Sequence, residues 1–592
     1  MRLVLSIVSF SLAVIFLGAG IAQRTIFLQP GSVVETVSAP ATTVYTVLGP
    51  SVLQQHSGAP TLSATGTGTM TVAYGRTDDV LAWIGAAEYT QVDIVDGQTN
   101  VQTVTPDSET VVEPDAPSTG SPAGSDLWLN EGTGDGAAFV TSNVPDGYSA
   151  IVAADGSAPA PSDLRIAWPI DNSTPWVGPF LVLGAVLFIV GAVLFWLNWR
   201  DTHRAGPRRK GVPAIESPTR RALPASRAPK RRELGPARGR RAFFTAVALV
   251  TVTPVLLSGC SAEYWPGGTG SSGDATPAPT TTSADGTTSL EPAVTVPQME
   301  RILSRISEFA NAADTGLARD QLSLRFAGPA LAARDANYVI RSRKADYAVP
   351  VPIPAQPLTI TLPQQVDRSW PRLVMTVSQN ADDPTQAPVA LVLLQNSPRD
   401  NYHVYYAITL VPNAQSPQLA PASIGAPRLA ADSKLLKLQP NQLGAAYGDV
   451  LNQGEASQSA PLFLADGDTL LQQLGLAGQE AIRAQLPANS AIAFSASPGS
   501  APALALATND AGAIVAIEVD QLRRITPTDG GVVGFADGSA SAALSGFTAK
   551  SPRGVQSTSG LQLLFYVPSV DSGLPIQLLG WTESLIAASE IF

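Results

Sequence analysis

Hydrophobic residues along this chain gather in three long runs and two regions of short segments. The most uniform run extends from Trp176 to Trp199 and holds 24 residues without a charge. A helix needs only about 20 residues to cross a bilayer. Tryptophans stand at both ends of the run, where indole rings favour the headgroup layers. Residues 176–199 are therefore predicted to form a transmembrane helix.

A second apolar run opens the chain within residues 1–23, after a single cation. It is longer than the roughly 7–15-residue core of a signal peptide, so we expect a retained transmembrane helix or signal anchor, with a cleaved signal as the alternative. Gly184 and Gly191 give the helix at 176–199 a face of small residues that another helix can approach closely, with chance use of small residues in an apolar helix as the alternative. Gly18 and Gly20 are expected to face that seam.

Residues 25–172 consist of short alternating or β-branched segments separated by Gly, Asp and Pro turns. Short strands with frequent turn signals are typical of an antiparallel sandwich or barrel. We therefore expect an all-β domain outside the cytoplasm. The predicted strands are Ser32 to Val37, Thr43 to Leu48, Thr69 to Tyr74, Gln91 to Val95, Val101 to Val104, Ala138 to Thr141, Tyr148 to Val152 and Leu164 to Trp168.

A basic segment, residues 200–241, follows the transmembrane helix with 14 Lys or Arg against three acids, a net charge of +11. Short loops rich in Lys and Arg remain in the cytoplasm, so residues 25–172 and 261–592 are predicted to lie outside. This topology is that of a multi-pass protein of a bacterial cell membrane. Binding of anionic lipids is a second interpretation of the loop, whereas nucleic acid is disfavoured because no aromatic residue interleaves the charges.

The third apolar run, residues 242–260, is marginal as a spanning helix because it is short and contains Pro254. It is predicted to be either a third transmembrane helix or a lipoprotein-type signal. The segment Leu257-Ser258-Gly259-Cys260 at its end is similar to the lipobox of bacterial lipoproteins. This resemblance implies that the Cys260 thiol accepts a lipid and that Cys260 becomes a new N-terminus. The position departs from the family, whose signals open a chain.

Residues 261–292 are mostly Gly, Ser, Thr, Ala and Pro, a composition typical of a flexible linker. Beyond this linker, a pattern of helices followed by strands occurs twice, in residues 293–412 and 438–592, with a second linker at 413–437 between them. The repetition predicts tandem α+β domains. In the second of them, Ala542 to Phe547 is predicted to be one of the strands.

The first α+β unit carries a resemblance to a known family. Its segment Phe326-Ala327-Gly328-Pro329-Ala330-Leu331, continuing to Tyr338, resembles the helical region of NTF2-like (cystatin-like α+β) domains of exported bacterial proteins. The resemblance implies helices packed on one face of a curved sheet, a fold that can enclose an apolar pocket. It covers about residues 295–412 and is weaker in the second unit.

Candidate chemistry is sparse in this sequence. The chain has one Cys and three widely spaced His residues, which excludes internal disulfides and gives no metal-ligand spacing. No sequence motif for a catalytic, cofactor or metal site is present. The densest polar-aromatic cluster contains Tyr402, His403, Tyr405 and Tyr406. Strand alternation predicts His403 and Tyr405 on one face and Tyr402 and Tyr406 on the other, as ordinary packing residues.

Two hypotheses for function follow. The first is a non-catalytic cell-envelope protein whose exported domains bind a protein, glycan or lipid partner. The alternative is an exported enzyme or apolar-ligand carrier in envelope glycan or lipid assembly, which a deep pocket with a strongly shifted carboxyl pKa would favour. The Ala, Arg, Gly and Pro content and the domain layout resemble uncharacterised membrane proteins of high-GC Gram-positive bacteria (actinobacteria).

Overall fold

The computed structural model describes residues 1–27, 30–107, 119–170, 174–204, 292–355, 358–364, 369–380, 383, 385–412, 417–421 and 424–592. The chain divides into two compact units, Met1–Val33 with Trp168–Thr282 and Val34–Ala167 with Ser283–Phe592. Most of the basic loop, the third apolar run with Cys260 and nearly all of the first linker lie outside the described residues.

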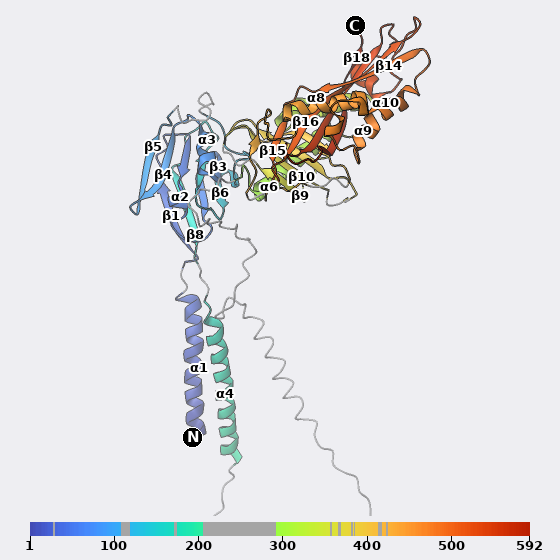
Figure 1. Cartoon of the computed structure of the whole chain (residues 1–592). Coiled ribbons are helices and arrows are strands. Elements are labelled where there is room, and N and C mark those ends of the chain that lie inside the picture. Colours follow the sequence, from blue (N-terminus) through green and yellow to red (C-terminus); the bar gives the residue numbers. More distant parts are fainter. Residues whose placement is uncertain are drawn as a thin grey trace, which may run out of the picture. The chain divides into compact units, whose positions relative to one another are not determined.

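Two helices in the described part of the chain are long and apolar enough to cross a membrane. They are α1 (Arg2–Thr25) and α4 (Val177–Arg204), and they lie side by side (Figure 1). A Cβ on Gly184 would lie 2.7 Å from Leu17, so this glycine gives α1 close access to α4. The prediction for Gly20 holds in part, because it packs on Leu181 rather than on a glycine. The prediction for Gly18 is wrong, because no atom comes within 4 Å of its Cβ position.

Hydrogen bonds also join the two helices. The Ser6 hydroxyl donates to the Gly191 carbonyl at 3.0 Å, and the Ser9 hydroxyl donates to the Leu187 carbonyl at 2.7 Å. Serine hydroxyls of this kind hold helices together where no water competes for them. The two candidate spans therefore form one antiparallel pair.

The β-rich domain (residues 34–167) contains a strand at every predicted position. Its strands are β1 (Ser32–Ser38), β2 (Tyr45–Leu48), β3 (Thr61–Arg76), β4 (Tyr89–Val95), β5 (Gln98–Val104), β6 (Asn130–Thr141), β7 (Tyr148–Ala153) and β8 (Asp163–Pro169). The long strand β3 pairs with β6, with β8 through its first residues and with β7 through its last. All eight strands belong to one sheet.

Two features of this domain differ from the predicted all-β, antiparallel arrangement. Strands β2 and β4 pair in parallel. The domain also contains two helices, α2 (Pro50–Leu53) and α3 (Thr77–Ile84). Helix α3 forms because Asp78 and Asp79 favour its N-terminus, while Val80, Trp83 and Ile84 bury one face.

The C-terminal module (residues 292–592) contains helices and two antiparallel sheets. Its helices are α6 (Val296–Gly316), η2 (Arg319–Leu324), α7 (Gly328–Arg343), α8 (Pro440–Gln453), η3 (Gly454–Ala456), η4 (Ala460–Leu462), α9 (Thr469–Leu474), α10 (Leu476–Arg483) and α11 (Ala540–Ser545). The first sheet contains β9 (Leu358–Gln364), β10 (Arg372–Ser378), β11 (Val389–Gln395) and β12 (His403–Thr409). The second contains β13 (Arg428–Leu429), β14 (Ser490–Pro498), β15 (Leu504–Ala507), β16 (Ala513–Pro527), β17 (Val555–Val567) and β18 (Gln577–Glu590).

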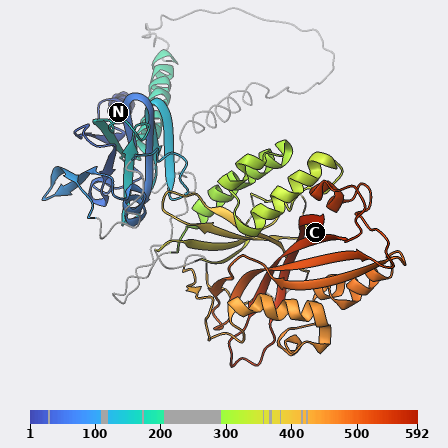
Figure 2. The ribbon, with the colours of Figure 1, turned by 90° about the horizontal axis from the view of Figure 1, so that it is seen from above.

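The two sheets pack face to face, with helices on their outer faces (Figure 2). One core cluster lies between α6, α7 and the first sheet, and another lies between α8, α9 and the second sheet. A third cluster joins the sheets themselves, with Met375, Val392 and Tyr406 packing against Ile514 and Leu564. The C-terminal region is therefore α+β as predicted, in four layers of helices, sheet, sheet and helices.

Two sequence predictions in the module are wrong for local reasons. Ala542 to Phe547 is not a strand but overlaps α11. The Ser539 hydroxyl caps the start of this helix, and Gly546 ends it in the left-handed conformation at φ 69°.

Tyr402 and Tyr406 do not share a face. A β-bulge opposite Val392 and Leu393 inserts an extra residue at Tyr405, so Tyr402 joins the cluster under α6 and α7 while Tyr406 enters the cluster between the sheets.

Candidate functional site

Several ion pairs gather at the contact between the β-rich domain and the C-terminal module. Its central residue is Asp126, which is fully buried. Its carboxylate accepts a hydrogen bond from Arg325 at 2.5 Å and another from the Tyr402 backbone N–H at 2.9 Å. Arg305 adds an ion pair at 3.5 Å, and the Asp126 N–H donates to the Asn401 side chain. All of these partners of Asp126 belong to the C-terminal module.

A second buried ion pair joins α3 of the β-rich domain to β10 of the C-terminal module. Arg372 of β10 donates to the Asp79 carboxylate at 2.5 Å, and both side chains are almost inaccessible to water. The Arg372 guanidinium also stacks on the Trp370 ring, 3.9 Å from its centroid. Trp370 packs against the apolar cluster of the β-rich domain. The tryptophan thus anchors the module, and the arginine beside it neutralises the buried acid.

Helix α6 contributes a third group of contacts. Gln298 and Arg301 donate to the backbone carbonyls of residues 127–129, and Arg305 pairs with Glu131. Burial, followed by the nearby charge of Arg305, lowers the pKa of the Arg301 guanidinium. The helix is held in register by a capping box in which Thr295 and Gln298 satisfy each other's backbone N–H groups.

Arg399, in the loop before β12, contacts the C-terminal end of α3 in the β-rich domain. Its guanidinium donates to the carbonyls of Trp83, Ile84 and Thr119 and lies 4.6 Å from the centroid of the Trp83 ring. Trp83 in turn packs edge-on against Tyr45 at 5.5 Å. Arg399 therefore links the module to the core of the β-rich domain.

The charges in this interface are divided between the two partners. The acids Asp79, Asp126 and Glu131 belong to the β-rich domain, and most of the arginines belong to the C-terminal module. Such complementarity favours correct pairing more than it adds net stability. We call this set of contacts the docking interface.

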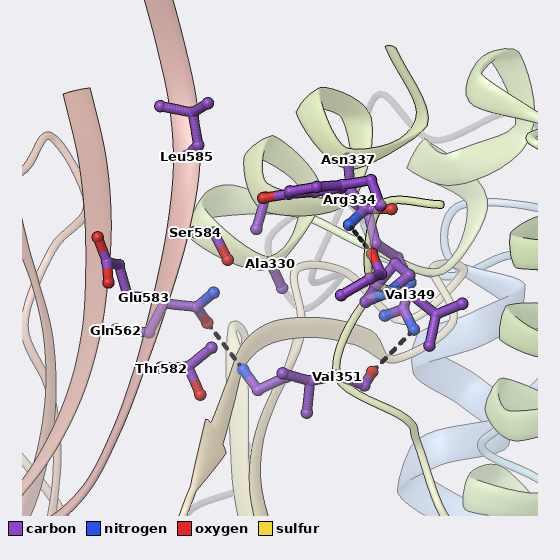
Figure 3. Close-up of a pocket in the computed structure, with 15 residues that line it drawn as sticks. Ala330, Arg334, Asn337, Val349, Val351, Gln562, Thr582, Glu583, Ser584 and Leu585 are labelled. Atoms are coloured by element: carbon purple, nitrogen blue, oxygen red, sulfur yellow. Dashed lines mark hydrogen bonds between the residues drawn. The ribbon is translucent and has the colours of Figure 1, made fainter. Parts of the chain in front are cut away.

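The module also contains a small cavity of about 180 Å³ between α7 and the second sheet. Figure 3 shows Arg334 and Asn337 on α7 facing Gln562, Thr582 and Ser584 of the strands. Arg334 is held by the Asp314 carboxylate at 3.0 Å and by the Val351 carbonyl at 3.0 Å. Ligand pockets typically have volumes of about 300–1,000 Å³, so this cavity accommodates only a small group.

Two acids on β16, the buried Glu518 and the half-buried Asp520, lie outside the residues that line this cavity. Burial, followed by the charge of Asp520, raises the pKa of Glu518, and burial raises the pKa of Asp520. The Glu518 carboxylate accepts a hydrogen bond from the Ala501 N–H at 3.4 Å, and a Cβ on Gly499 would lie 2.4 Å from its side chain. The two acids with raised pKa values and the cavity are therefore separate features.

Residues 290–590 match the model of a family described as a domain of unknown function, DUF8094. The chain belongs to this family. Comparisons with curated proteins and with solved structures gave no match. The match covers the C-terminal module, which we now call the DUF8094 module, and leaves out the β-rich domain.

Few of the sequence-predicted residues take part in these sites. Cys260 and its flanking Leu257, Ser258 and Gly259 lie outside the described residues. Tyr402 contributes to the docking interface through its backbone N–H. Among the His, Cys, Asp and Glu residues that the structure describes, no group of three or more could hold a metal ion.

Sequence reasoning missed the docking interface itself. Its acids and arginines are up to about 300 positions apart in the chain, and no short motif joins them. The one local signal was the paired acids Asp78 and Asp79 before an apolar helical pattern.

Proposed function

We propose that this protein is a non-catalytic cell-envelope membrane protein whose β-rich domain and DUF8094 module together bind an envelope partner: a protein, glycan or lipid. The observation that carries the proposal is that Val34–Ala167 and Ser283–Phe592 form one compact unit, although α4 lies between them in the sequence. A compact unit joined by buried ion pairs lies on a single side of a membrane.

This arrangement supports a specific topology. If α1 and α4 both span the membrane, residue 205 is on the side opposite to the β-rich domain, and the DUF8094 module must return to that domain. The chain then crosses the membrane once more within residues 205–291, and the apolar run 242–260 is the candidate for this third crossing. The basic loop 200–241 is then cytoplasmic, where it meets anionic lipids, and both large domains are exported.

The third run either remains as a transmembrane helix or acts as a lipoprotein-type signal that ends at Cys260. In the second case the Cys260 thiol carries lipid, and the DUF8094 module is anchored by acyl chains. Mass spectrometry of the native protein distinguishes the two. An unmodified peptide running through Gly259 and Cys260 at high occupancy would eliminate lipidation.

We also propose that each half of the DUF8094 module is an NTF2-like unit. Each half packs helices on one face of a mostly antiparallel sheet, which supports this relation. The segment from Phe326 to Tyr338 that carries the resemblance includes the end of the loop between η2 and α7 and most of α7. The cavity beside α7, at about 180 Å³, is smaller than a typical ligand pocket.

Site-specific photocrosslinking in native membranes tests partner binding. A photoreactive residue is placed at exposed apolar positions of both domains, such as Phe139, Leu435 and Leu574. The proposal predicts discrete, light-dependent adducts at some of these positions and none in unirradiated controls. The absence of any discrete adduct across both domains would contradict it.

A further inference from the structure

We infer that the β-rich domain and the DUF8094 module form a complex that persists without the covalent connection between them. In this complex the arginine-bearing face of the DUF8094 module is a docking surface for the β-rich domain of this chain, whose acids Asp79, Asp126 and Glu131 it contacts. The inference rests on the proposed function, because it assumes that both domains lie on the same side of the membrane.

The docking interface has the composition of a contact between separate proteins. Such interfaces are dominated by a few Trp, Tyr and Arg residues in desolvated positions. Here Trp370 packs against the core of the β-rich domain, and Arg325, Arg372 and Arg399 reach buried acids or carbonyls. The number of hydrogen bonds across the docking interface is comparable to the roughly 10 found in a typical protein–protein interface.

Each partner also has a core of its own. The β-rich domain encloses an apolar cluster that includes Tyr45, Trp83, Trp128 and Ile151. The DUF8094 module contains three clusters, two beneath helices and one between its sheets. The family match covers residues 290–590 and does not include the β-rich domain. The interface therefore joins two units that are each built to fold.

The ability of the two domains to stay together without a covalent connection matters if the chain is cut between them. Hydrolysis of the peptide bond between Gly259 and Cys260 would leave the two domains on separate polypeptides. Water adds its hydroxyl to the Gly259 carbonyl carbon, forming a carboxylate, and a hydrogen to the Cys260 nitrogen, forming an amine. The docking interface would then keep the DUF8094 module with the part of the chain that carries α1 and α4. Association would change from intramolecular to intermolecular, and affinity at the interface would determine whether the complex survives.

The experiment uses the full-length protein in detergent, with the site of a sequence-specific protease inserted after Gly268. After complete cleavage, size-exclusion chromatography measures whether the two fragments elute together. We expect co-elution at physiological salt. Separation of the wild-type fragments at micromolar concentration would overturn the inference and leave the topology proposal intact, because the latter is tested without cleavage.

Charge reversal identifies the interface responsible. Asp126→Arg places a cation against Arg325 and Arg305, and we expect the affinity of the cleaved fragments to fall by about 30-fold or more, the size of effect at a strong interface position. The matched control is Asp135→Arg, an exposed acid of the same domain, which should leave co-elution unchanged. Should Asp126→Arg fail to fold, Arg399→Ala provides the second measurement. Undiminished affinity in the folded variant would overturn the assignment of the interface.

Discussion

The carboxylate of Asp126 in the β-rich domain lies 2.5 Å from the guanidinium of Arg325 in the DUF8094 module, 199 positions further along the chain. Both side chains are buried, and the candidate spanning helix α4 lies between them in sequence. A buried pair of this kind forms only when its two domains are on the same side of a membrane. This relationship connects the fold to the proposed topology.

Removal of the Asp126 carboxylate should weaken docking strongly. Asp126→Ala leaves the buried Arg325 without its counter-charge, a change that typically costs about 3–5 kcal/mol. Trp83, Trp128 and Trp370 lie in or beside the interface, so intrinsic tryptophan fluorescence during thermal unfolding reports the loss of docking. The control Asp135→Ala removes an exposed acid of the same domain and should have little effect. Equal behaviour of the two variants would show that Asp126 does not hold the domains together.

Trp370 should be the main apolar anchor of the interface. Trp370→Ala removes its packing on the β-rich core and the ring on which Arg372 stacks, and we expect a loss of about 2 kcal/mol or more in docking free energy. Limited proteolysis of the purified protein measures this as faster cleavage between the domains. The exposed Phe139 serves as the matched position, since Phe139→Ala removes an aromatic ring outside this contact. Identical proteolysis rates for the two variants would contradict the anchoring role.

The helix pair α1 and α4 makes a separate prediction. Gly184→Leu should push the helices apart, because even a Cβ at this position lies 2.7 Å from Leu17. Disulfide formation between cysteines substituted at Ser9 and Leu187, in a chain without Cys260, measures the approach of the helices in membranes. Gly18→Leu is the control and should preserve the crosslink, since Gly18 faces open space. Unchanged crosslinking in Gly184→Leu would show that this packing does not form.

Glu518 gives a prediction for the pH dependence of stability. Burial, with a further contribution from Asp520, raises the folded-state pKa of Glu518, so folding takes up a proton. The contribution of this proton uptake to the free energy of unfolding is complete below the unfolded-state pKa of about 4.3. It is lost as the pH rises through the folded-state pKa. Glu518→Gln does not titrate and should raise Tm relative to wild type at pH 8 more than at pH 4. The exposed Glu455→Gln is the control, and a Tm difference that does not change with pH would contradict this account.

The local pattern of residues was enough to locate most elements of secondary structure. All eight strands of the β-rich domain were predicted, because alternation and turn residues act over a few positions. The exceptions were also local but depended on competing signals. The caps Ser539 and Gly546 turned an apolar segment into α11, and the bulge at Tyr405 reversed the faces of Tyr402 and Tyr406.

The docking interface could not be predicted in the same way. Arg372 and Asp79 are 293 positions apart, and each alone is an ordinary charged residue in the sequence. Burial turns such residues into a site only after both domains have folded and met. The same reasoning applies to the cluster between the two sheets of the DUF8094 module. Strands rich in Val and Leu do not indicate which sheet will cover them.

The orientation of the domains is the most direct test of this account. Epitope tags with a protease site are inserted after Gly97, Gly211 and Gly530, and protease is added to intact spheroplasts. Gly97 and Gly530 lie in exposed turns of the β-rich domain and the DUF8094 module. We predict cleavage at these two positions and protection at Gly211 until the membrane is permeabilised. Cleavage at Gly211 in intact spheroplasts, or protection at either Gly97 or Gly530, would contradict the claim that both domains are exported and docked on one side of the membrane.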